Sequence, residues 1–176
     1  MWIVGQSRAS NLTYRGPYAV RHRGQESAGI AASDGTLIRH HKAMGYVNEV
    51  FNSESLSKLP GTQAVGHVRY STAGESLVAN AHPIVVDSIH GQLAVCHNGN
   101  LVNAGELRDA LVRCGALFQT NSDTEVSVHL FARWREGHVE EAIMHASAQV
   151  RGGFAVRVRT GDEAIGGRRP TGVRAQ

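Results

Sequence analysis

The order in which apolar patterns follow one another along this chain limits the folds open to it. Strand-length apolar runs come first, at residues 27–32, 63–70 and 92–97, each leading into a polar, glycine-bearing turn. Apolar residues at helical spacing follow, and strand-like apolar runs return at residues 153–158 and 164–166. Antiparallel strands followed by consecutive helices predict an α+β sandwich with helices packed on sheets, and argue against a doubly wound parallel fold.

Turn and cap residues predict where several elements begin. Asp34-Gly35, between two short apolar runs, predicts a tight hairpin. Residues 122–125 read Ser-Asp-Thr-Glu and have the form of a capping box, after which apolar residues continue at helical spacing as far as Trp134. Asp123 is therefore expected in the first turn of a helix.

A second helix is predicted from Asn103, which is followed three residues later by Glu106. Its apolar face includes Leu107, Leu111 and Cys114, so Cys114 is expected in the core. A third helix is predicted at residues 139–148.

Composition favours one soluble, cytoplasmic domain over residues 1–176. The excess of 18 Lys and Arg over 15 Asp and Glu is too small to indicate a nucleic-acid partner. The first residues contain no apolar run of the length that a signal peptide or membrane span needs. Cys96 and Cys114 form neither a disulfide framework nor a zinc motif, which is typical of reduced thiols in the cytoplasm.

Three polar clusters, at residues 22–27, 66–74 and 97–101, stand apart from the core pattern. Asn98-Gly99, in a turn after a strand, offers an amide and a backbone N–H to a developing oxyanion. Arg69 is suited to hold a carboxylate, and Asp123 an ammonium group. Each also has a structural interpretation, as a turn, a surface ion pair and a helix-dipole partner respectively, so only the combination favours function.

Four blocks of this sequence resemble the amidophosphoribosyltransferase family and occur in the family's order. They read HRGQESAGIA (22–31), GHVRYSTAG (66–74), HNGNLVNAGELR (97–108) and TNSDTEV (120–126). Weaker similarity continues through residues 152–155 and 168–174, where the family usually has an acidic residue in place of Arg169. The resemblance implies an N-terminal-nucleophile hydrolase fold, which is an αββα sandwich.

The resemblance also implies roles in glutamine hydrolysis. In this family an N-terminal cysteine attacks the side-chain amide of glutamine, and the ammonia passes to a phosphoribosyltransferase domain. Asn98 and Gly99 would form the oxyanion hole, Arg69 would hold the α-carboxylate of glutamine, and Asp123 its α-amino group. The remaining matched residues are those of a mobile loop over glutamine, namely Tyr70, Ser71 and Thr72, and Arg23, which would support the N-terminus.

The chain departs from the family at its first residues, which read Met1-Trp2-Ile3-Val4-Gly5 instead of Cys-Gly. Met1 stands at the nucleophile position if Gly5 is aligned, and Trp2 does if the initiator methionines are aligned. Neither side chain forms a thiolate, so we expect turnover to fall by several orders of magnitude, while glutamine binding could survive. Cys96 lies in an apolar strand and lacks the α-amine base, so a core role is expected for it.

The second departure is that Gln176 precedes the remaining strands of the sandwich and the phosphoribosyltransferase domain of full-length relatives. The glutaminase domain is therefore expected to be truncated and to use no cofactor of its own. Magnesium and, in some relatives, an iron-sulfur cluster belong to the full-length family, as does homo-oligomer formation. The expected partners are glutamine and a phosphoribosyltransferase domain or subunit.

Alternative functions remain open from the sequence. The glutaminase domain of glucosamine-6-phosphate synthase shares the fold, but its first block reads more like YRGYDSAG. A catalytically dead module that binds glutamine and regulates, or a gene remnant without a stable fold, would also lack the nucleophile. Ten histidines, including His40-His41, raise the question of a metal site, but their spacing forms no HxxxH or HExxH motif.

Overall fold

The computed structural model describes residues 1–19, 26–70, 77–152, 154–159 and 164–168. The elements are, in chain order, β1 (Trp2–Ile3), α1 (Ala9–Ala19), β2 (Ser27–Ser33), β3 (Ile38–Met44), α2 (Val47–Val50), α3 (Ser53–Ser57), β4 (Gln63–Arg69), the 3-10 helix η2 (Val78–Asn80), β5 (Ile84–Ser88), β6 (Gly91–Gly99), α4 (Ala104–Arg113), α5 (Asp123–Arg133), α6 (Val139–Gln149), β7 (Phe154–Arg159) and β8 (Ala164–Arg168).

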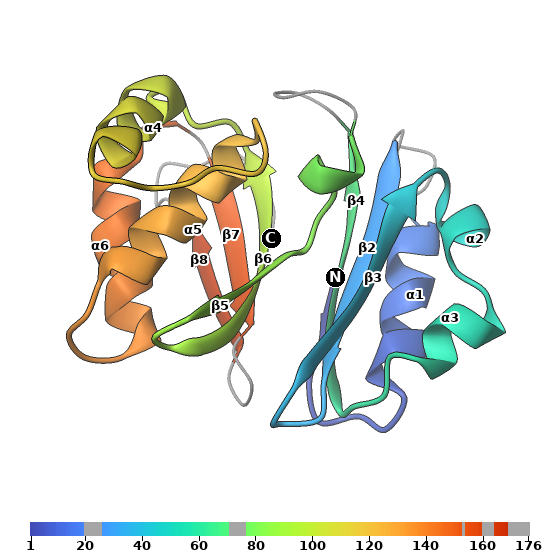
Figure 1. The fold of residues 1–176 in the computed structure, drawn as a ribbon. Coiled ribbons are helices and arrows are strands. Elements are labelled where there is room, and N and C mark those ends of the chain that lie inside the picture. Colours follow the sequence, from blue (N-terminus) through green and yellow to red (C-terminus); the bar gives the residue numbers. More distant parts are fainter. Residues whose placement is uncertain (20–25, 71–76, 153, 160–163, 169–176) are drawn as a thin grey trace.

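The described elements form four layers. Two four-stranded antiparallel sheets, ordered β1-β4-β2-β3 and β5-β6-β7-β8, lie face to face. Helices α1, α2 and α3 cover the outer face of the first sheet, and α4, α5 and α6 cover that of the second (Figure 1). The predicted α+β sandwich and its αββα layering are confirmed.

Apolar side chains fill the three spaces between these layers. The two outer cores are built from large residues such as Phe51 and Phe131. The core between the sheets is made mostly of small residues, including Ala31, Ala94 and Cys96, which lets the sheets approach closely. Cys96 is 4% exposed, so its predicted core position is confirmed.

The first hairpin is present, but its turn is longer than predicted. The last pair of β2 and β3 is Ser33 with Ile38, so four residues connect the strands. Oδ1 of Asp34 accepts hydrogen bonds from the N–H groups of Thr36 and Leu37, each at 3.0 Å. This aspartate turn includes Thr36 and Leu37, so the connection is longer than the tight Asp34-Gly35 turn that the sequence predicts.

Helix α5 begins at the predicted residue, with half of the predicted capping box. The Ser122 hydroxyl accepts a hydrogen bond from the N–H of Thr124 at 3.2 Å. The Glu125 carboxylate does not turn back to Ser122, because it accepts the N–H of Thr120 at 2.7 Å instead. Trp134 lies just beyond the end of the helix, so the predicted helical stripe ends one residue too late.

Helix α4 also begins where predicted, but Asn103 does not cap it. Its side chain donates to the carbonyl of Gln149 at 2.9 Å and accepts the N–H of Arg151 at 2.7 Å, which ties α4 to the start of the last hairpin. The prediction of Cys114 in the core is wrong. The helix ends before Cys114, which is exposed, whereas Leu111 is buried.

Helix α6 and the pair of β7 and β8 lie where the sequence predicted them. Helix α1 was not predicted, because it contains Gly16 and Pro17, two residues that usually interrupt helices. Within the described part of the chain, every helix is too short or too polar to cross a lipid bilayer.

Candidate functional site

The ends of β4 and β6 meet at one end of the sandwich, here called the site end. The rings of His67 in β4 and His82 lie 4.8 Å apart between centroids. His82 comes two residues before Ile84, and Ile84 pairs with Val95 in β6. Continuing this antiparallel register by two residues places His82 near the level of residue 97. Because the His67 ring lies beside the His82 ring, His67 is near that level too. The last residues of both strands, Arg69 and Gly99, therefore reach the same end.

Arg69 lies on the face of β4 that looks toward the second sheet. Side chains alternate along a strand, and Val65, four residues earlier, packs in the core between the sheets. The Arg69 side chain is 8% exposed, and its Nη1 lies 3.9 Å from Oε2 of Glu26. The alternative of a surface ion pair is thus wrong, because this guanidinium is buried.

Asn98 and Gly99 belong to β6 and do not form a turn after it. They pair with Ala155 and Phe154 at the start of β7, a strand more than fifty residues later in the chain. The alternation that places Cys96 between the sheets places Asn98 on the same face, toward the first sheet. Asn98 is exposed.

Asp123 is the first residue of α5 and lies on the helix side of β6. Its Oδ2 accepts the N–H of Leu101 at 2.9 Å, and its Oδ1 lies 3.5 Å from Nδ1 of His97. Burial alone would raise the pKa of Asp123, but hydrogen bonds from His97 and from backbone N–H groups outweigh it and lower the pKa. The carboxylate is therefore held in its charged form beside residues 97–101.

The N-terminus extends the first sheet. The Met1 amino group donates to the carbonyl of Gly66 at 2.7 Å, and the N–H of Gly66 donates back to the carbonyl of Met1 at 2.9 Å. The Met1 thioether packs against Gly16 in α1, where a Cβ would overlap the sulfur. Trp2 pairs with Val65, so its side chain lies on the face toward the second sheet.

Some predicted site residues lie outside the described part of the chain, namely Arg23, Ser71 and Thr72. Tyr70 follows β4 directly and is 65% exposed. The structure thus brings Arg69, Asn98, Gly99 and Asp123 to one end of the sandwich.

A half-buried lysine and a buried histidine near the site end were not predicted. Lys42 donates to the carbonyl of Ala81 at 2.6 Å, and burial lowers its pKa. His82 is 4% exposed, and among the described residues neither of its ring nitrogens has a hydrogen-bond partner. Burial, followed by the charge of His67, holds the pKa of His82 well below its ordinary value. Nothing in the sequence distinguishes Lys42 or His82 from other strand and loop residues.

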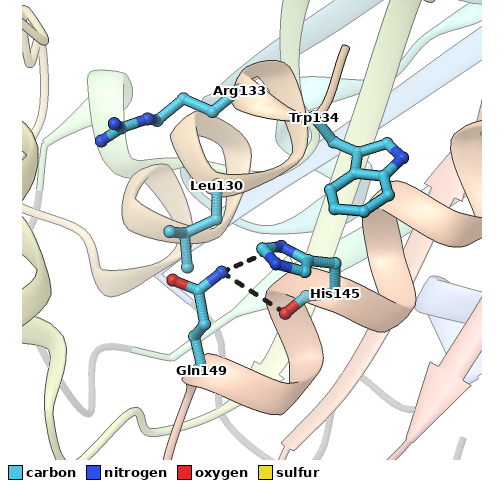
Figure 2. Close-up of a pocket in the computed structure, with 5 residues that line it drawn as sticks. All are labelled: Leu130, Arg133, Trp134, His145 and Gln149. Atoms are coloured by element: carbon cyan, nitrogen blue, oxygen red, sulfur yellow. Dashed lines mark hydrogen bonds between the residues drawn. The ribbon is translucent and has the colours of Figure 1, made fainter. Parts of the chain in front are cut away.

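A cavity of about 270 Å³ lies between α5 and α6, at the opposite end of α5 from Asp123 (Figure 2). The side chains around it are Leu130, Arg133, Trp134, His145 and Gln149. Gln149 and His145 are hydrogen-bonded to each other at 3.1 Å. No sequence pattern indicated this cavity.

The histidines of the described residues do not assemble a metal centre. Within those residues, no three His, Cys, Asp or Glu side chains lie together in a way that could hold a metal ion. His41, one of the adjacent pair, instead faces the carbonyl of Val50 at 3.1 Å.

Comparison with known proteins gives matches over nearly the whole chain. A family model described as a glutamine amidotransferase domain matches residues 67–175. The amidophosphoribosyltransferase of Bacillus subtilis (strain 168) is 42% identical over 173 residues, which are 98% of this chain and 36% of the relative. That of Archaeoglobus fulgidus is 44% identical over 168 residues, or 94% of this chain and 36% of the relative. The chain thus spans little more than a third of these relatives' length.

Solved structures give the same result. The B. subtilis glutamine phosphoribosylpyrophosphate amidotransferase complexed with ADP and GMP superimposes with a TM-score of 0.91 at 41% identity, covering 98% of this chain and 37% of that one. A structure titled as the allosteric regulatory enzyme of purine biosynthesis gives 0.93 at 42% identity, with the same coverage. The predicted N-terminal-nucleophile hydrolase fold is confirmed.

Proposed function

The chain belongs to the glutamine amidotransferase domain family, and on this premise we propose that its site end binds glutamine. The arrangement of Arg69, Asn98 and Asp123 carries the proposal. A buried guanidinium on β4 faces the sheet that bears Asn98, and a charged carboxylate lies beside the same strand. Glutamine offers a matching carboxylate, ammonium and amide.

In this proposal each group has one partner on glutamine. The Arg69 guanidinium pairs with the α-carboxylate through parallel N–H donors, and Asp123 accepts hydrogen bonds from the α-ammonium group. The Asn98 side chain and the Gly99 N–H point their dipoles at the amide oxygen, where negative charge develops during hydrolysis. Tyr70, Ser71 and Thr72 contact the ligand from the segment after β4.

Isothermal titration with glutamine tests this assignment, with two arginines of the first sheet compared. Arg69→Ala removes the buried guanidinium, whereas Arg39→Ala removes an exposed one that pairs with Asp34. Loss of charge-assisted hydrogen bonds worth about 1.5–3 kcal/mol predicts roughly 10- to 100-fold weaker binding for Arg69→Ala. Arg39→Ala should bind as the wild type does. Equal affinities of all three proteins would rule out the proposed carboxylate site.

We further propose that a polypeptide beginning at Met1 binds glutamine without hydrolysing it. Hydrolysis needs a thiol to attack the amide carbon, whereas the Met1 sulfur is an alkylated thioether packed on Gly16. Cys96 is buried between the sheets within a β-strand, and it has no α-amine of its own to act as base. Arg23 would support the N-terminal residue.

A glutamate-release assay tests this second proposal. The Met1→Cys chain, released with a free N-terminal cysteine, should hydrolyse glutamine at least about 10³-fold faster than the wild type, in line with losses on removing a nucleophile. Measurable glutamate release by the wild type, at a rate comparable with that of Met1→Cys, would show that another group performs the attack. Cys96→Ser would then identify whether that group is the buried thiol.

The comparisons support a place for this domain in amidophosphoribosyltransferase chemistry rather than in glucosamine-6-phosphate synthesis, since the curated relatives carry the former name. We propose that ammonia from glutamine serves phosphoribosylamine formation in purine biosynthesis where this domain carries an N-terminal cysteine and is joined to a phosphoribosyltransferase domain or subunit. Magnesium would act in that second part. The Met1 form, by the proposal above, is a catalytically dead glutamine-binding module.

A further inference from the structure

His97 lies between two groups to which the proposed function gives roles. It is 5% exposed and sits in β6 directly before Asn98, with its ring on the helix side of the strand. Its Nδ1 lies 3.2 Å from Oγ1 of Thr124 and 3.5 Å from Oδ1 of Asp123. The ring therefore connects the start of α5 to the strand that carries Asn98.

The Asp123 carboxylate is held at both of its oxygens by residues 97–101. Leu101 donates its N–H to Oδ2, and His97 faces Oδ1. A carboxylate has about four lone-pair positions, so the contacts with His97 and with the N–H groups of Leu101 and Thr124 still leave room for an ammonium group. Rotation of the carboxylate about its χ2 angle would have to break at least one of these contacts.

An ionised carboxylate only accepts hydrogen bonds, so the charge of Asp123 favours a proton on the His97 nitrogen that faces it. This assigns the Nδ1–H tautomer to the neutral ring, with Thr124 as a second acceptor. The other tautomer would place a lone pair against the Asp123 charge.

From this geometry we propose that His97 is a positioning residue for the α-amino group of glutamine, acting through Asp123. The inference rests on the proposed function, because it gives Asp123 the amine of glutamine as its ligand. The Nδ1–H of His97 fixes the carboxylate, and the strand fixes Asn98 relative to the same ring. One residue thus sets the spacing between the amine-binding group and the amide-binding group.

The test compares glutamine with glutaramate, which is glutamine without its α-amino group, by isothermal titration. His97→Leu keeps a similar volume without a donor, whereas His97→Asn can place an amide N–H where Nδ1 lies. His97→Leu should weaken glutamine binding by on the order of tenfold or more and leave the glutaramate affinity unchanged. His97→Asn should recover most of the glutamine affinity.

Each other outcome has a distinct meaning. Equal losses for glutamine and glutaramate in His97→Leu, or no loss for either, would overturn the positioning role. Absence of glutamine binding to the wild type would overturn the proposed function and the inference with it. Long-range ¹H–¹⁵N spectra of the wild-type imidazole add a test without ligand, in which the Nε2–H tautomer would contradict the proposed contact.

Discussion

Removal of the Glu125 carboxylate should destabilise the segment that leads into Asp123. Glu125 is 7% exposed and accepts three hydrogen bonds, from the N–H of Gln119 at 2.9 Å and from the N–H and hydroxyl of Thr120, both at 2.7 Å. Hydrogen bonds to a charged group contribute about 1.5–3 kcal/mol each. This carboxylate therefore clamps residues 119–120 onto the first turn of α5.

The size of the effect depends on which bonds each variant loses. Glu125→Gln keeps one acceptor oxygen, which can serve both Thr120 donors, and turns an NH₂ group toward Gln119. One bond is lost, so the free energy of unfolding should fall by about 1.5–3 kcal/mol. Glu125→Ala loses all three bonds, but water can replace the carboxylate at the N–H of Gln119, which reduces the loss. The free energy of unfolding is therefore expected to fall by about 3–5 kcal/mol.

Urea unfolding followed by circular dichroism measures both values, provided that the slope with urea stays constant. Glu106→Gln is the matched control, because Glu106 is exposed in the first turn of α4, where the favourable interaction of its charge with the helix dipole is worth less than about 1 kcal/mol. If Glu125→Gln is no more destabilising than Glu106→Gln, the clamp does not hold in solution.

Further predictions concern packing, pH and thiols. Gly29→Ala should destabilise the folded protein by about 1–3 kcal/mol, because the added Cβ would overlap the His82 carbonyl oxygen. Gly105→Ala should stabilise it by about 0.4–1 kcal/mol, because the space around this position of α4 is open. Thermal unfolding of both variants checks this. His82 has a lowered pKa in the folded protein, so the unfolded chain binds the proton more readily. The free energy of unfolding should therefore fall as the pH drops below about 6.5, by at most about 1.4 kcal/mol per pH unit. Urea midpoints measured at several pH values should depend less on pH in His82→Gln than in the wild type. With a thiol reagent, the exposed Cys114 should react at once in the native protein and the buried Cys96 only after unfolding; two fast thiols would contradict the packing between the sheets.

The layers could be predicted because local periodicity fixes them. The side chains of strands such as β4 alternate between the two faces of the sheet. Helix α5 begins with a serine cap that depends on neighbouring residues alone. Helix α1 could not be predicted from local signals. Its Gly16 is explained only by Met1, which packs against it from the edge of the sheet.

Side chains used for tertiary contacts were the other source of error. Asn103 has the sequence of a cap, but residues 149 and 151, brought in by the last hairpin, take its hydrogen bonds. Asn98-Gly99 has the sequence of a turn, but pairing with β7 keeps it in a strand. Of the candidate residues, Arg69, Asn98, Gly99 and Asp123 lie at one end of the sandwich, whereas the His97 contact to Asp123 depends on how β6 packs against α5.

The most direct test of a glutamine site at this end of the sandwich is a titration of the ¹⁵N-labelled chain with glutamine, followed by ¹H–¹⁵N correlation spectra. The account predicts saturable shifts of the amide signals of Arg69 and Leu101, with those of His145 and Gln149 at the distant cavity unchanged (Figure 2). Shifts confined to the cavity, or no shifts at millimolar glutamine, would contradict it.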